Sequence, residues 1–164
     1  MRQENLNQLQ LALCSVIGEA AADFSEAAAA FAHLRDVAYD FWKHFDEEAM
    51  SAFVDENPES VRHNRHLASF AVNAEHAARD ASEVYSQLSK EAVLTAAKVA
   101  DGELAAAISW AVNLSRAIAV AMKHAKGARV AAEFCRSDLL RAVEHATGRA
   151  AAADNRAGMF CIRE

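Results

Sequence analysis

The chain has 164 residues and a formal net charge of −6, and its composition is dominated by 40 Ala against 28 Val, Ile and Leu combined. One Pro and five Gly leave too few turn residues for a β-sheet protein of this length, whereas Ala is the strongest helix former. The acidic balance disfavours a general binder of the phosphate backbone, so we expect no nucleic-acid partner.

Cysteine usage and hydropathy predict the cellular setting. Cys14, Cys135 and Cys161 are odd in number and far apart, and no Cys-x-x-Cys motif occurs, which indicates reduced thiols and a cytoplasmic location. Cys135 has no His within reach on its helix, so we interpret it as a free core or interface thiol rather than a nucleophile. The chain begins without a signal-peptide pattern and has no run of 18 apolar residues, so we expect no membrane contact.

The first segment has the clearest periodicity. Two series of apolar residues repeat every seven positions and alternate spacings of three and four, which is typical of helices packed side by side. They are Leu13, Ala20, Ala27, Leu34, Phe41 and Ile17, Phe24, Phe31, Ala38, Phe45. The pattern predicts one helix from about Glu4 to about Val54. A break at Asp23, where a capping box could form, is the alternative.

A second helix is predicted after Asn57-Pro58, where Asn suits the N-cap and Pro the first helical position. It runs to about Ala100, and the turn signal at Asp101-Gly102 ends it. We assign its inward face to two series. They are Leu67, Ala74, Ala81, Leu88 and Phe70, Ala77, Val84.

The third segment continues the same spacing until it slips at Gly127. Its two series are Leu104, Ala111, Ile118, Ala125 and Ile108, Ser115, Met122. We favour one kinked helix that ends near Gly148, where Gly is a good stop. The fold class is therefore all-α, an elongated antiparallel bundle of three long helices, or of four or five if Asp23 and Gly127 break helices. Residues 1–148 form one domain, and 149–164 form a weakly ordered tail.

The first hairpin is strongly acidic, and its local charge exceeds the net charge of the whole chain. Between Asp36 and Glu59 there are eight acidic residues, and Lys43 is the one base, for a local charge of −7. Such a tip either keeps the region soluble or docks a basic protein surface. Tyr39 and Trp42 lie beside the seam, by which we mean the packed face formed by the two apolar series. They either cover the edge of this face or form a contact hot spot. The predicted protein-binding residues are Tyr39, Trp42, Asp46, Glu47, Glu48, Asp55 and Glu56.

A helical bundle that binds a metal or a small ligand through His and carboxylates at the same hairpin is the alternative. An antiparallel pairing brings His44 and Glu48 level with His63 and His66, and this set offers ligands for Zn or Fe. Neither a paired Glu-x-x-His signature nor a His-Glu-x-x-His motif is present. The competing interpretation is a solvated face of i,i+4 pairs such as Asp40 with His44.

These features favour a non-enzymatic interaction protein over an enzyme. We expect an inhibitor, adaptor or immunity-type module that binds a protein with a basic surface and forms a homo-oligomer, without a cofactor. Three Ala-rich stripes rarely bury all their apolar surface, which is the reason to expect self-association.

Overall fold

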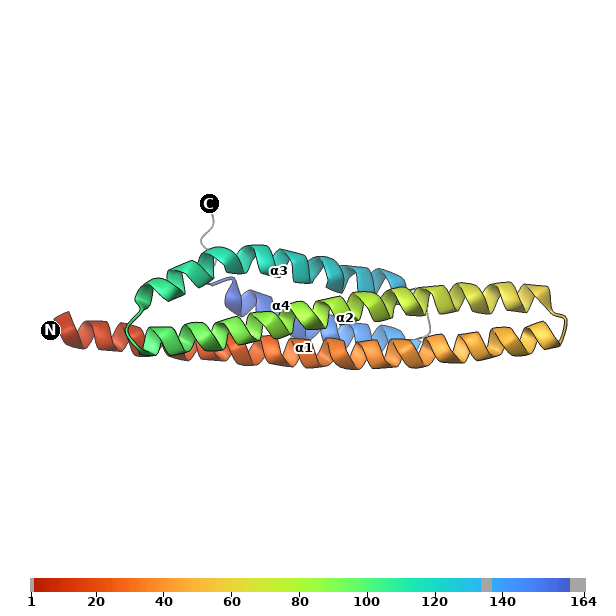
Figure 1. Ribbon diagram of the computed structural model, residues 1–164, viewed down its shortest axis with the longest axis horizontal. Coiled ribbons are helices and arrows are strands. Elements are labelled where there is room, and N and C mark those ends of the chain that lie inside the picture. The colour runs from red at the N-terminus through yellow and green to blue at the C-terminus, as the bar shows by residue number, and fades with distance from the viewer. Residues whose placement is uncertain (1, 134–136, 160–164) are drawn as a thin grey trace.

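The fold is an elongated all-α bundle, seen in a computed structural model that describes residues 2–133 and 137–159 (Figure 1). Within these residues the helices are α1 (Arg2–Val54), α2 (Pro58–Ala100), α3 (Leu104–Ala132) and α4 (Ser137–Ala157), with no strand. The long helices α1 and α2 form an antiparallel hairpin, and α3 and α4 lie along part of its length (Figure 1). Cys135 and Cys161 lie outside the described residues.

The predictions for the first two helices are confirmed. Helix α1 is continuous through Asp23, and most of its two apolar series are buried. Helix α2 begins at Pro58, and the Oδ1 atom of Asn57 caps it by accepting a hydrogen bond from the backbone N–H of Ser60 at 3.2 Å. The cap satisfies one of the amides that a helix start leaves without a partner.

The prediction of three helices is corrected to four within the described residues. Gly127 lies inside α3, and a Cβ there would make ordinary contact with the Cβ of Ala77 at 3.6 Å. Helix α3 ends at Ala132 instead, and α4 runs through Gly148 to Ala157. A small residue at 127 therefore reflects close packing of α3 on α2 rather than a kink. The predicted weak order of the tail is wrong over 149–157, which is helical and buries Ala150, Ala153 and Ala157.

Side-chain hydrogen bonds fix the register of the α1–α2 hairpin. The Ser82 Oγ donates to the carbonyl of Ala28 at 2.9 Å, and the Ser89 Oγ donates to the carbonyl of Ala21 at 2.8 Å. Each pair lies seven residues from the next on both helices, as the repeat of the seam requires. Small side chains at these positions let the two backbones approach closely.

The buried face of α2 and α3 differs from the predicted one. In α2 the second series is Ala71, Ala78, Tyr85, Ala92 and Val99, one residue beyond the series predicted from Phe70. In α3 the buried second series is Leu114, Ala121 and Ala128. Ile108 and Met122, which we expected in the seam, are 62% and 56% exposed. Spacings of three and of four residues both keep side chains on the same helix face, so two neighbouring series are possible in each helix. In α2 and α3 the buried series is the neighbour of the one that the sequence analysis selected.

Helix α3 is unusually apolar for a helix at the side of a bundle. Within the described residues its stretch Leu104–Ala131 is long and apolar enough to cross a bilayer by length and composition alone, and an 18-residue window inside it has a mean hydropathy of 1.5. Only 28% of that window is buried inside the bundle. This stretch is not identified by the search of the sequence for a run of 18 apolar residues.

Candidate functional site

The hairpin end, by which we mean residues 39–72, continues past α3 and α4 as a pair of helices (Figure 1). Its interior is a small cluster in which Phe45, Ala68 and Ala71 are buried. Phe41, Trp42 and Leu67 pack against this cluster and remain partly exposed. Two helices alone cannot enclose side chains of this size, so the end of the molecule presents apolar surface to its surroundings.

The predicted contact residues Tyr39 and Trp42 lie together on the hairpin end. Their ring centroids are 5.4 Å apart at a tilted angle, and Tyr39 is 52% exposed. With Val72, Glu75 and His76 of α2 they line a recess of about 210 Å³ between the helices. Aromatic rings beside polar groups are the composition that binding hot spots favour.

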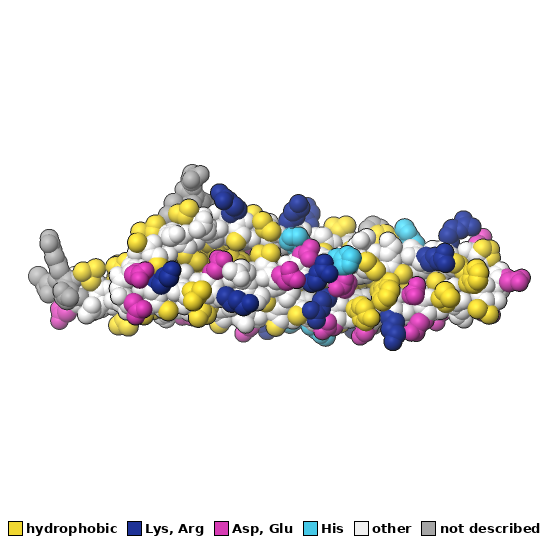
Figure 2. Space-filling model, in the orientation of Figure 1, with side chains coloured by type: hydrophobic (Ala, Val, Ile, Leu, Met, Phe, Trp, Pro, Cys, Tyr) yellow, Lys and Arg dark blue, Asp and Glu magenta, His cyan; other side chains and the backbone are white. Residues whose placement is uncertain are grey.

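The turn of the hairpin forms a second, more open recess of about 530 Å³. Phe53 and Val54 line it with Val61, and Phe53 is 66% exposed. Met50 is also exposed one helical turn earlier. Figure 2 shows hydrophobic side chains on one face of this end, with acidic and basic side chains around them. Sequence periodicity missed Phe53 and Val54 because they lie outside both predicted series.

The predicted acidic residues surround these apolar groups. Asp46, Glu47, Glu48, Asp55 and Glu56 are all exposed. In the part of the chain that the structure describes, Glu47 pairs weakly with Lys43 at 3.9 Å, and the other four make no ion pair. The hairpin end therefore combines apolar surface with carboxylates available to a partner.

Glu56 has an unusual backbone conformation. Its φ is +56°, the one positive φ of a non-Gly residue among the described positions. This left-handed conformation ends α1: the amide of Asn57 donates to the carbonyl of Ala52 at 2.9 Å. Gly is the usual residue at such a position, because a Cβ clashes there. A carboxylate thus occupies a position whose backbone favours Gly.

The four residues of the metal alternative are not brought together as a ligand set. Within the described residues, no group of three or more His, Cys, Asp or Glu side chains could hold a metal ion. The His44 ring instead contacts Phe45 at 5.6 Å, and the His66 ring contacts the edge of Phe70 at 4.7 Å. Two of the predicted ligands therefore pack against aromatic rings.

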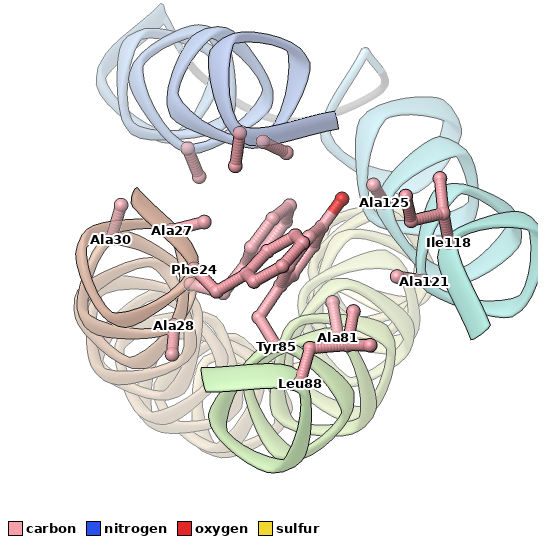
Figure 3. Packing of buried hydrophobic residues seen from close by; sticks show 14 of the residues in the cluster. Phe24, Ala27, Ala28, Ala30, Ala81, Tyr85, Leu88, Ile118, Ala121 and Ala125 are labelled. Atoms are coloured by element: carbon pink, nitrogen blue, oxygen red, sulfur yellow. The ribbon is translucent and has the colours of Figure 1, made fainter. Parts of the chain in front are cut away.

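A buried polar pair lies in the four-helix part, by which we mean the stretch where α3 and α4 pack along α1 and α2. This pair was not predicted from the sequence. Tyr85 is fully buried between Phe24 and Phe31, with ring centroids 6.2 and 5.8 Å away, and points into the centre of the bundle (Figure 3). Its hydroxyl donates to the Oδ2 atom of Asp154 on α4 at 2.9 Å. The Oδ1 atom of Asp154 is buried and has no hydrogen-bond partner among the described residues.

Burial sets the protonation of this pair. It raises the pKa of Asp154 to about 6, and the hydrogen bond from Tyr85 acts in the opposite direction. Burial, together with the nearby Asp154 carboxylate, also raises the pKa of Tyr85 well above its ordinary value. The hydrogen bond between Tyr85 and Asp154 joins α2 to α4 inside the bundle.

Exposed ion pairs hold the same helix in place. Arg149 pairs with Glu26 at 2.7 Å, and Arg156 pairs with Asp23 at 2.6 Å and also with Glu19. They fix α4 antiparallel to α1.

Comparison of the chain with protein-family models, with curated protein sequences and with solved structures finds no match.

Proposed function

We propose that this protein is a non-enzymatic interaction module whose hairpin end binds a protein with a basic surface. The observation that carries the proposal is the uncovered apolar surface of the hairpin end, next to four carboxylates that make no ion pair with the described residues. Monomeric proteins rarely leave aromatic and aliphatic side chains in such a continuous exposed area. The fold supports this proposal, because the four-helix part anchors the hairpin end that projects beyond it.

Apolar and acidic groups supply different parts of the binding. The Tyr39–Trp42 recess and the exposed Phe53 give buried contact area once a partner covers them. The carboxylates attract a basic partner over a distance of about 10 Å at ordinary salt and orient it before contact. The left-handed backbone of Glu56 also supports a binding role for the hairpin end, since strained residues persist most often where function requires them.

The test is affinity capture from the native host with charge-reversed variants. Glu47→Lys together with Glu48→Lys adds four positive charge units to the hairpin end and is expected to abolish capture. The matched control is Glu83→Lys with Glu144→Lys, which makes the same change at exposed sites outside the hairpin end. Circular dichroism of each variant verifies that the helices are intact.

A second variant separates apolar contact from charge. Phe53→Ser removes an exposed ring without a change of charge and is expected to weaken capture by about tenfold or more. Equal capture by the wild type, both hairpin variants and the control would reject the hairpin end as the binding surface.

A further inference from the structure

Helix α3 has a charge pattern opposite to that of the hairpin end. Between Leu104 and Ala132 it carries four cationic side chains and no Asp or Glu, in a chain whose net charge is −6. The cations are Arg116, Lys123, Lys126 and Arg129. Within the described residues, Arg129 pairs with the neighbouring Glu133 at 3.6 Å, and the other three make no ion pair.

The same helix exposes aliphatic side chains. Most of the large ones on its outer side are about half exposed or more. They are Ile108, Val112, Val120, Met122 and Val130. Residues three, four and seven apart share a helix face, so Ile108, Val112 and Met122 form one stripe. Figure 2 shows basic side chains among hydrophobic ones along the upper edge, where α3 runs.

The basic face of α3 and the acidic hairpin end do not neutralise each other within one chain. The hairpin end continues along the rod past the last residues of α3 (Figure 1). No ion pair among the described residues joins α3 to positions 39–72; the one charged contact of α3 to α2 is His124 with Asp80 at 3.7 Å. One molecule therefore presents two complementary surfaces at different places.

We infer that a second copy of this chain is the partner: the hairpin end of one molecule docks on the outer face of α3 of the next. The inference rests on the proposed function, because it takes the hairpin end as the binding site and names what binds there. The carboxylates of the hairpin end face the cations of α3, and the exposed apolar side chains of the two surfaces cover one another.

A contact of this kind is heterologous, since each molecule uses two different surfaces. After two copies dock, one hairpin end and one α3 face remain free in the pair, so growth continues until a ring closes or a filament forms. The apolar residues of α3 are Val, Ile and Met without an exposed aromatic ring, which suits the rings of the hairpin end better than insertion into a bilayer, where Trp, Phe and Leu anchor helices.

Charge exchange between two variants tests the docking directly. The first variant carries Glu47→Lys and Glu48→Lys, which removes the net negative charge of the hairpin end; the second carries Lys123→Glu and Lys126→Glu, which removes the net positive charge of α3. Sedimentation velocity at low salt over a range of concentrations measures association. We expect the wild type to associate and high salt to dissociate it. Each variant alone is expected to bind itself about tenfold or more weakly, and an equimolar mixture of the two is expected to associate again.

A control variant and three other possible outcomes test whether the partner is a second copy of the chain. Glu83→Lys with Glu144→Lys is expected to associate like the wild type, since both sites lie outside the two surfaces. A monomeric wild type that floats with phosphatidylglycerol vesicles, with binding lost in the Lys123→Glu, Lys126→Glu variant, overturns the inference in favour of a lipid surface. A monomeric wild type with hairpin-dependent capture of another protein overturns the inference and leaves the proposed function intact. Association that only the α3 variant weakens rejects docking through the hairpin end and leaves the proposed function to the capture experiment.

Discussion

Tyr85 and Asp154 are the residues whose chemistry is least expected from the rest of the core. A bundle lined mainly by Ala, Leu and Phe places a hydroxyl and a carboxyl in contact at its centre. Burial of the carboxylate disfavours its charged form, and one of its oxygens has no partner among the described residues. The pair therefore links the docking of α4 to pH.

The first prediction concerns this link. The pKa of Asp154 is raised from 3.8 to about 6 in the folded protein, so its contribution to stability is fully present below pH 3.8 and is lost as the pH rises through about 6. Because the side chain is partly exposed, we expect a loss of about 1–2 kcal/mol between pH 4 and pH 7 rather than the full value of the shift.

Asp154→Asn isolates that contribution. The amide keeps an oxygen that can accept the hydrogen bond from Tyr85 and cannot ionise. Thermal unfolding of both proteins across this range gives the difference, and the His residues they share cancel. The variant is expected to be the more stable protein at pH 7 and to approach the wild type near pH 4. Parallel pH profiles of the two proteins would contradict the assignment.

The hydroxyl of Tyr85 has a measurable effect of its own. Tyr85→Phe keeps the stacking on Phe31 and removes the donor to Asp154, which leaves a second carboxylate oxygen without its bond. We expect a loss of about 1–3 kcal/mol at neutral pH, as for other buried groups left unsatisfied. Chemical denaturation measures it, and the loss should shrink in the Asp154→Asn background. A neutral effect in both backgrounds would show that the hydrogen bond adds no net stability.

Helix boundaries illustrate how far the sequence predicts this fold. The unbroken repeat from Leu13 to Phe45 and the Asn57-Pro58 cap predicted α1 and α2 closely, because both signals are local. The end of α3 has no comparable signal: Gly127, the one visible irregularity, packs against Ala77 inside the helix. Contacts between helices determine such a Gly, and a single sequence does not reveal them.

The faces of α2 and α3 were harder to predict than their ends. In an Ala-rich helix, small residues occupy buried and exposed positions alike, so the choice between spacings of three and four depends on a few large residues. Phe70 favoured the wrong series in α2, and Ile108 did so in α3. The series Ala71, Ala78, Tyr85, Ala92, Val99 was visible, and its selection would have placed Tyr85 in the core. The apolar surface of the hairpin end could be predicted in part from Tyr39 and Trp42.

Two Gly-related substitutions test the element boundaries. Gly127→Ala is expected to stabilise the protein by about 0.5–1 kcal/mol, because the added methyl makes ordinary contact with Ala77 and a helix prefers Ala to Gly. The measurement is the midpoint of urea denaturation. A marked destabilisation would contradict the ordinary contact with Ala77 and favour the kink at Gly127 that the sequence suggested.

Glu56→Gly is the complementary change at the end of α1. Gly adopts the left-handed conformation of this residue without a steric cost, so we expect a gain of about 1 kcal/mol in the same urea measurement. The same variant should bind its partner more weakly, since it loses one carboxylate of the hairpin end. A loss of stability would show that the Glu56 side chain stabilises the turn itself.

On the scale of the whole molecule, the hairpin determines the shape. A helix of 53 residues at 1.5 Å per residue is about 80 Å long. A rod of that length has a radius of gyration of about 23 Å, against about 15 Å for a compact domain of the same number of residues. Small-angle X-ray scattering of the dissociated protein at high salt is expected to give the larger value. A value near 15 Å would mean that the hairpin folds back on itself.

The two Trp residues provide a way to observe the two halves of the molecule separately. Trp110 is buried where α3 meets the rest of the bundle, and Trp42 is partly exposed on the hairpin end. The emission of Trp110 therefore reports whether α3 stays attached, whereas the quenching of Trp42 by acrylamide reports whether the hairpin end is covered. With either Trp replaced by Phe, the natural fluorescence of the chain follows binding and unfolding as separate signals, without an attached dye.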